Sequence, residues 1–132
     1  YIDVPAEKIR IYKELDSVEK DSELDKMAAK LTDRFGPVPE EVSHLFDIVR
    51  IRHRGKKLGF EKIIIKNGIL IAFFISNPMS SYYKSKVFTG ILEKMQHLAG
   101  VCELNNKNGK LRIISRKVDS LAKAYDVLGK LL

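Results

Sequence analysis

The sequence predicts an α+β fold in which three N-terminal helices precede two units of β-hairpin plus helix. Apolar residues recur at three- and four-residue spacing as far as Leu58, and after Gly59 they form short continuous runs. Two hairpin-like segments follow, each succeeded by a helical pattern. Together these observations predict an antiparallel sheet of about four strands that is covered by helices.

The first predicted helix runs from Pro5 to about Val18. Proline is tolerated in a first helical turn, where its missing N–H would have no partner, and apolar residues then recur at helical spacing. Asp21 or Ser22 is predicted to cap the second helix. The apolar stripe of this second helix consists of Leu24, Met27, Ala28, Leu31 and Phe35.

The segment KLTDRFGPVPEEV, residues 30–42, contains the end of the second helix and the start of the third. Gly36 is expected to provide a left-handed stop, and Pro37 prevents continuation. The third helix is predicted to start near Pro39 and to reach Leu58. Its expected buried stripe consists of Val42, Leu45, Phe46 and Val49.

Two hairpins are predicted in the second half. The first is KIIIKNGILIAFFI, whose turn is Asn67-Gly68, a pair that accepts the positive φ angles of a type I′ turn. The second consists of VCEL and KLRIIS, with NNKNG as a longer loop between them. Neighbouring strand residues point to opposite sides, so Phe73 and Phe74 predict a sheet covered on both faces.

Two further helices complete the pattern. One is predicted over about residues 80–98, because apolar side chains recur there at helical spacing. The last is predicted to start at a cap formed by Asp119 or Ser120 and to continue toward the C-terminal end.

Length and composition predict one domain, residues 1–132, with a helical region over residues 1–58 and a mixed β/α region over residues 59–132. A cytoplasmic protein with no membrane partner is expected, because no apolar run approaches the roughly 20 residues that span a bilayer and no signal peptide is evident. Cys102 is expected to be a buried thiol. A chain that begins with Tyr1 is expected to be a fragment of a larger multidomain protein.

The net charge of +7 is unevenly distributed. Residues 1–35 contain nine acids and seven bases, whereas residues 63–132 contain four acids and eleven bases. A basic C-terminal half permits contact with nucleic acid or with an acidic partner, although a solvated surface is the commoner explanation.

The sequence lacks the motifs of common catalytic sites. It has no G-x-x-x-x-G-K-[ST], G-x-G-x-x-G or G-x-S-x-G pattern. His44, His53 and His97 have no cysteine or carboxylate at ligand spacing and are expected to be surface helix residues. We therefore predict no catalytic, cofactor-binding or metal-binding residue, and no enzyme activity, in this domain.

The run RIRHRGKKLG suggests an alternative function. Arg50, Arg54 and Lys57 fall at i, i+4 and i+7, so on a helix they share a face that could bind phosphates. Against this, basic residues near a helix C-terminus are stabilising in themselves, and the run has no aromatic residue for base stacking. An autonomous nucleic-acid-binding module stays open, and it predicts salt-dependent binding of duplex DNA.

The segment LTDRFGPVPEEV, preceded by SELDKMAAK and followed by LFDIVRIR and KKLGFEKI, resembles the C-terminal domain of the bacterial transcription-repair coupling factor family. The N-terminal YIDVPAEKIRIYKEL is similar to the start of that domain, in which an extended Tyr-Ile segment leads into a helix. The resemblance covers about Tyr1 to Ile64, and D-R-F-G-P-x-P is its specific part.

In that family the full-length protein is an ATP-driven translocase on double-stranded DNA that displaces stalled RNA polymerase and recruits the excision-repair protein UvrA. The resemblance implies that ATP and magnesium act in the parent, which binds UvrA, RNA polymerase and duplex DNA, and that this fragment contains no cofactor and none of the motor. It implies an autoinhibitory domain that docks on the N-terminal UvrA-binding module of the same protein. Undocking would be a two-state switch.

The same resemblance assigns docking to Met27, Lys30, Asp33 and Arg34. Polar residues here are expected to face away from the apolar stripe of the second helix, and Asp33 suits contact with a basic surface. Lys30 departs from relatives that tend to be acidic at this position, so either the polarity of the docking patch differs here or the contact has moved. The alternative is that these residues form the solvated face of an amphipathic helix.

Overall fold

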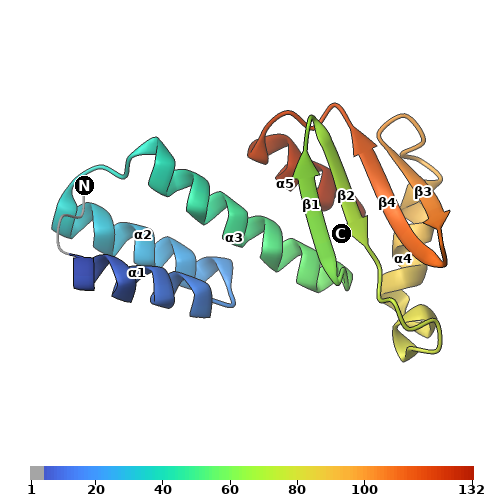
Figure 1. Ribbon diagram of the computed structural model, residues 1–132, viewed down its shortest axis with the longest axis horizontal. Coiled ribbons are helices and arrows are strands. Elements are labelled where there is room, and N and C mark those ends of the chain that lie inside the picture. Colours follow the sequence, from blue (N-terminus) through green and yellow to red (C-terminus); the bar gives the residue numbers. More distant parts are fainter. Residues whose placement is uncertain (1–4) are drawn as a thin grey trace. The chain divides into compact units, whose positions relative to one another are not determined.

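The computed structural model describes residues 5–132, which form two compact units, a helical unit that ends at His53 and a mixed unit from Arg54 to Leu132. The predicted α+β class is confirmed (Figure 1). In chain order the elements are α1 (Pro5–Ser17), α2 (Asp21–Phe35), α3 (Glu40–Leu58), β1 (Lys62–Lys66), β2 (Ile69–Phe73), the 3-10 helix η1 (Ser81–Lys84), α4 (Lys86–Met95), β3 (Cys102–Lys107), β4 (Lys110–Arg116) and α5 (Leu121–Leu131). The extended segment expected at Tyr1-Ile2 lies outside the described residues.

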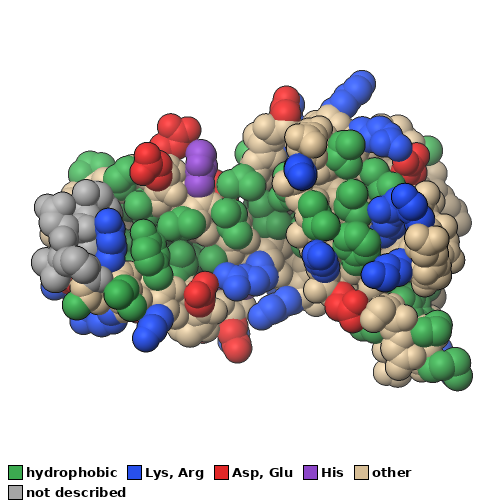
Figure 2. Space-filling view, in the orientation of Figure 1, with side chains coloured by type: hydrophobic (Ala, Val, Ile, Leu, Met, Phe, Trp, Pro, Cys, Tyr) green, Lys and Arg blue, Asp and Glu red, His purple; other side chains and the backbone are tan. Residues whose placement is uncertain are grey.

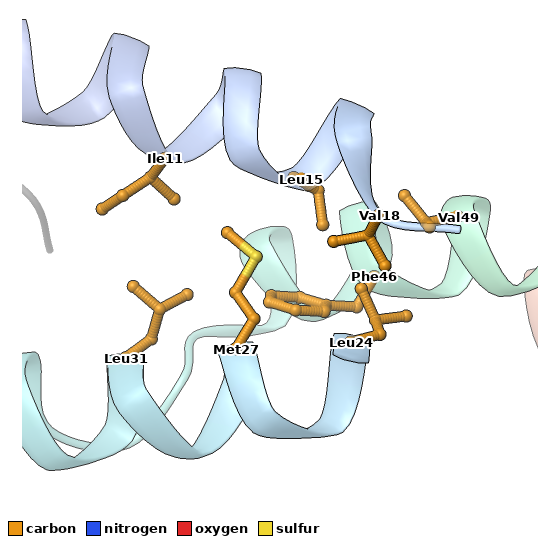
Figure 3. Packing of buried hydrophobic residues seen from close by; sticks show 8 residues of the cluster. All are labelled: Ile11, Leu15, Val18, Leu24, Met27, Leu31, Phe46 and Val49. Carbon is orange, nitrogen blue, oxygen red and sulfur yellow. The ribbon is translucent and has the colours of Figure 1, made fainter. Parts of the chain in front are cut away.

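The helical unit has its own apolar core (Figure 3). Helical spacing directs one stripe of each helix toward the other two, and burying apolar side chains there stabilises the unit. The core residues are Ile11, Leu15, Val18, Leu24, Met27, Leu31, Phe46 and Val49. The predicted stripe of α2 is confirmed, with Leu24, Met27 and Leu31 buried and Ala28 and Phe35 packed against the core.

The start of α2 differs from the prediction. Its N-cap is Lys20, which makes no side-chain cap hydrogen bond, so the expected cap at Asp21 or Ser22 is wrong. The Asp21 carboxylate instead lies 2.6 Å from Nδ1 of His53. The Asp21 carboxylate that was predicted to cap α2 therefore pairs with a residue 32 positions later in the sequence.

His53 is buried, with 5% of its surface exposed, so its expected place on the surface is wrong. It follows Val49 by four positions and therefore lies on the core side of α3. Its Nε2 lies 3.0 Å from the carbonyl oxygen of Val18. Together with Asp21, this contact ties the connection between α1 and α2 to α3.

The junction between α2 and α3 is built as predicted. Gly36 ends α2 at the predicted position, and its N–H donates to the carbonyl oxygen of Thr32 at 2.9 Å. Its φ of +90° is positive as expected, but its ψ of −171° is extended and not left-handed helical. The first turn of α3 includes the carbonyl oxygen of Pro39, which accepts from the Ser43 N–H at 2.9 Å. The predicted helix stop and restart are therefore confirmed.

The mixed unit contains a four-stranded antiparallel sheet in the order β1-β2-β4-β3. Asn67 and Gly68 have φ of 54° and 74°, which confirms the predicted hairpin turn. The longer loop expected in NNKNG is wrong, because β3 continues to Lys107 and only Asn108 and Gly109 form the turn. Their φ angles of 54° and 75° repeat the first turn, so the Asn-Gly pair decides where the second hairpin closes.

The single helix expected over residues 80–98 is two helices. Ser80 accepts a hydrogen bond from the Tyr82 N–H and starts η1, and Ser85 accepts one from the Phe88 N–H and starts α4. Two serine caps therefore divide one apolar pattern into two helical starts. The predicted cap of α5 at Ser120 is confirmed, because its hydroxyl accepts from the Lys123 N–H.

Within the mixed unit, α4 and α5 lie on one face of the sheet (Figure 1). Leu70, Ala72 and Ile113 point toward these helices and are fully buried. Phe74 is also buried, but Phe73 lies on the opposite face, which carries no helix of this unit and leaves its ring half-exposed. The expectation that the sheet is covered on both faces is therefore wrong within this unit.

Cys102 is buried as predicted, and burial raises the pKa of its thiol. Among the described residues, no helix is long and apolar enough to cross a membrane.

Tyr82 belongs to an aromatic cluster with Phe60, Phe74, Tyr83 and Phe88. Its hydroxyl donates to the carbonyl oxygen of Leu58. Burial, with a smaller contribution from neighbouring Tyr83, raises the pKa of Tyr82 to about 12. The neutral phenol is therefore the form that the folded state favours.

We expect stability to fall at alkaline pH because of this phenol. A raised folded-state pKa contributes stability that is complete below about pH 10, where unfolded tyrosine ionises, and is lost as the pH rises to about 12. Denaturant unfolding at a series of pH values measures the decline, and Tyr82→Phe is expected to make it shallower. An equally steep decline in the variant would contradict this assignment.

Candidate docking surface

A groove of about 480 Å³ opens between α1 and α2 in the helical unit. All four residues assigned to docking, Met27, Lys30, Asp33 and Arg34, line it. The structure therefore brings them to one place, because these positions recur every three to four residues along α2 and share one strip of its surface. The other lining residues are Arg10, Ile11, Glu14, Leu31 and Phe35.

Met27 has a different position from the other three. Only 5% of its surface is exposed, and its side chain is part of the core between the helices (Figure 3). Met27 therefore forms the floor of the groove and supports α2 against α1. Lys30, Asp33 and Arg34 are exposed at its edge and are the groups that a partner can reach.

Arg34 is held in place by α1. Its guanidinium lies 2.5 Å from the carboxylate of Glu7, which also forms an ion pair with Arg10 at 3.4 Å. The Arg34 guanidinium is also 5.2 Å from the ring centroid of Phe35. Because the Glu7 side chain is only 15% exposed, the anchor is well sheltered, and the arginine is preorganised across both helices.

Asp33 makes no ion pair within the part of the chain that the structure describes. It is exposed beside Lys30 and Arg34, so its carboxylate can form an ion pair with a basic side chain of a partner protein. The groove thus presents charges of both signs, with one anchored arginine and two exposed carboxylates, Glu14 and Asp33, that make no ion pair among the described residues. Such an arrangement favours a partner whose surface also carries both signs, with a base placed to meet Asp33.

Sequence reasoning missed the contribution of α1 to the groove. Glu7, Arg10 and Glu14 fall at i, i+3 and i+7, so they form one charged strip on the first predicted helix. That spacing was visible in the sequence. Which strip of α2 it faces depends on the packing of the two helices, and the sequence pattern does not specify this.

The residues of the nucleic-acid alternative have partners of their own. Arg50 lies 3.2 Å from Asp47 and 3.3 Å from Asp25. These two carboxylates offset its charge. A phosphate would have to compete with them for the same guanidinium.

Arg54, in the mixed unit, is covered by α5. Its guanidinium stacks 3.3 Å from the ring centroid of Tyr125 and donates to the Tyr125 carbonyl oxygen at 2.5 Å. Lys57 is exposed. Two of the three predicted phosphate contacts are therefore occupied by protein groups, which weakens the nucleic-acid alternative.

Within residues 5–132, no three His, Cys, Asp or Glu side chains come together as a metal-binding group. His44 is exposed 3.7 Å from Glu40 on the same helix, and His97 is exposed in the turn after α4.

These features define an α+β domain with an open, charged groove on its helical unit. Residues 1–85 match the family model of the TRCF domain. The chain belongs to the TRCF domain family, as the sequence resemblance predicted.

Curated relatives support this assignment. The transcription-repair-coupling factor of Escherichia coli strain K12 is 36% identical over 56 residues, or 42% of this chain. That of Rickettsia bellii strain RML369-C is 31% identical over 81 residues, or 61% of the chain. The matched segments span only 5% and 7% of these two relatives, so the chain corresponds to a small part of each.

A solved structure shares the fold. It is described as the crystal structure of the C-terminal domain of transcription-repair coupling factor, and it matches with a TM-score of 0.74 at 18% identity. The match covers 99% of this chain and 82% of that chain. The similarity therefore extends beyond residues 1–85 and includes the sheet of the mixed unit.

Proposed function

We propose that this chain is a non-catalytic, autoinhibitory domain that docks on the N-terminal UvrA-binding module of its parent protein and masks it in the resting state. The observation that carries the proposal is the convergence of Met27, Lys30, Asp33 and Arg34 on one open groove. The parent would be an ATP- and magnesium-dependent translocase that contacts RNA polymerase and duplex DNA through its other parts.

The exposed charges supply a physical basis for docking. Glu7 holds Arg34 in one position, so little side-chain freedom is lost when that arginine meets a partner. Asp33 is open to a basic side chain on the module. Removing one member of a buried, hydrogen-bonded charge pair at an interface typically costs about 2–5 kcal/mol, which is enough to govern a two-state switch.

Docking within one protein needs only modest affinity. A tethered partner acts at an effective concentration on the order of millimolar, so a dissociation constant of about 0.01 mM between separate pieces would keep about 99 molecules in 100 masked. Release then requires only that engagement of the parent with its target remove a contact worth about 1–3 kcal/mol.

The proposal is tested by mixing this 132-residue chain with the separately produced UvrA-binding module. Calorimetric titration is expected to give a dissociation constant at or below about 0.1 mM, and added UvrA is expected to displace the chain. An absence of binding at that concentration would overturn the docking, and binding that UvrA does not displace would overturn the masking.

A further inference from the structure

The positive charge of the protein is concentrated in the mixed unit. Residues 54–132 hold 15 of the 24 lysines and arginines but only five of the 17 aspartates and glutamates. The helical residues 1–53 hold more acids than bases. The proposed docking groove on α2 therefore leaves the strongest charge feature of the chain unexplained.

Much of this charge borders the sheet face opposite α4 and α5. The strand register places Ile64, Ile71 and Ile114 in one row across β1, β2 and β4. Ile69 and Phe73 extend the row into an apolar centre, in which Ile114 is buried and the other four side chains are partly exposed. Figure 2 shows these strands as apolar side chains bordered by Lys and Arg. We call this surface the outer sheet face.

Strand alternation puts six bases and one acid around that centre. The bases are Lys62, Lys66, Lys107, Lys110, Arg112 and Arg116, and the acid is Glu103. Glu103 accepts from Arg116 at 2.8 Å, and Arg112 donates to the amide oxygen of Asn105 at 3.0 Å.

The four lysines form no ion pair among the described residues. Lys107 and Lys110 lie directly opposite each other at the β3–β4 turn, an arrangement that costs stability through like-charge repulsion. An acidic partner would relieve this repulsion.

We propose that the outer sheet face binds an acidic protein segment whose apolar side chains contact the isoleucine row and whose carboxylates meet the surrounding lysines. An apolar centre within a charged rim is the usual anatomy of a protein–protein interface. The excess of bases specifies the charge of the partner and speeds its association.

The composition of the centre favours a protein over a nucleic acid. Sheets that bind single-stranded RNA or DNA stack bases on exposed aromatic rings. The apolar centre here is isoleucine apart from Phe73, and the Lys62 ammonium lies 6.0 Å from the centroid of that ring. Aliphatic side chains offer no stacking surface to a base, whereas they pack well against apolar side chains of a peptide.

The binding test uses three probes against the intact 132-residue chain: a peptide that alternates valine with glutamate, the same peptide with lysine for glutamate, and a mixed-sequence single-stranded oligonucleotide. The glutamate peptide is expected to bind at least tenfold more tightly than the lysine peptide, with an affinity that falls as salt rises. Equal affinities would overturn the proposal. Tighter binding of the oligonucleotide would also overturn it, by identifying a nucleic-acid surface.

Variants locate the site. Lys66→Glu reverses an exposed rim charge and is expected to weaken binding of the glutamate peptide by about tenfold. Ile71→Thr keeps a β-branched side chain and is expected to weaken binding of the same peptide by at least about threefold. Lys86→Glu makes the same charge change at the start of α4, away from this face, and serves as the matched control. Equal weakening by Lys66→Glu and Lys86→Glu would show non-specific attraction and overturn the proposed site.

Discussion

Asp33→Lys in the full-length parent is expected to raise its affinity for UvrA by about tenfold or more. Asp33 is exposed in the α1–α2 groove and makes no ion pair among the described residues. If Asp33 pairs with a basic side chain of the UvrA-binding module, a lysine at this position replaces attraction by repulsion. A loss of about 1.4 kcal/mol of docking free energy lowers the docking equilibrium constant by a factor of about ten. UvrA then meets an accessible module in a larger fraction of molecules.

The measurement is the dissociation constant of UvrA for the wild-type parent and for the variant. Glu93→Lys makes the same charge change at an exposed position of α4 in the mixed unit and is expected to leave UvrA binding unchanged. The increase has a ceiling, because a module that is masked in about 99% of molecules can gain at most about a hundredfold in apparent affinity. A folded Asp33→Lys variant with wild-type affinity would contradict a docking role for this carboxylate.

Gly59→Ala is expected to destabilise the chain by about 2–5 kcal/mol, a large effect for the addition of one methyl group. Gly59 has φ +81°, a conformation that costs an alanine about 1–2 kcal/mol. An added Cβ would also lie 2.2 Å from Cε2 of Tyr82. That ring cannot move away freely, because its hydroxyl donates to Leu58 and its face packs in the aromatic cluster.

Two other glycines separate these costs in denaturant unfolding. Gly68 has φ +74° and no atom within 4 Å of an added Cβ, so Gly68→Ala is expected to cost only the conformational part, about 1–2 kcal/mol. Gly90 lies within α4 with the same open space, so Gly90→Ala is expected to stabilise by about 0.5–1 kcal/mol. If Gly59→Ala costs no more than Gly68→Ala, the close packing of Tyr82 on this glycine is contradicted.

The helical unit could be predicted well because hydrophobic periodicity reports directly on burial. The stripe that includes Leu24 and Leu31 packs as its spacing indicates, and Gly36 ends α2 with a positive φ. His53 was wrongly expected on the surface, because a histidine is buried only with polar partners and its partner Asp21 lies far away in the sequence. Its four-residue spacing from Val49 was the available signal.

Boundaries in the mixed unit were less predictable, because local hydrogen bonds decide between competing patterns. Apolar spacing runs through residues 80–98, but the Ser85 hydroxyl caps a new helix within that range. NNKNG contains several turn-forming residues, and only the Asn108-Gly109 pair forms the turn. Composition therefore indicated a turn without indicating which two residues form it.

The candidate site could be predicted on α2 and not on α1. The resemblance assigned Lys30, Asp33 and Arg34 to one surface, and all three line the groove. The anchoring of Arg34 by Glu7 is a contact between two helices, which neither periodicity nor resemblance specifies. The burial of Met27, by contrast, could be predicted, because this residue belongs to the apolar stripe of α2.

The masking proposal is tested by measuring UvrA binding to the intact parent with and without this domain. Deletion of residues 1–132 is expected to raise the affinity for UvrA at least about tenfold, to the level of the isolated N-terminal module, because no docked state can then form. Unchanged UvrA binding after the deletion would contradict the proposal that this domain masks the module.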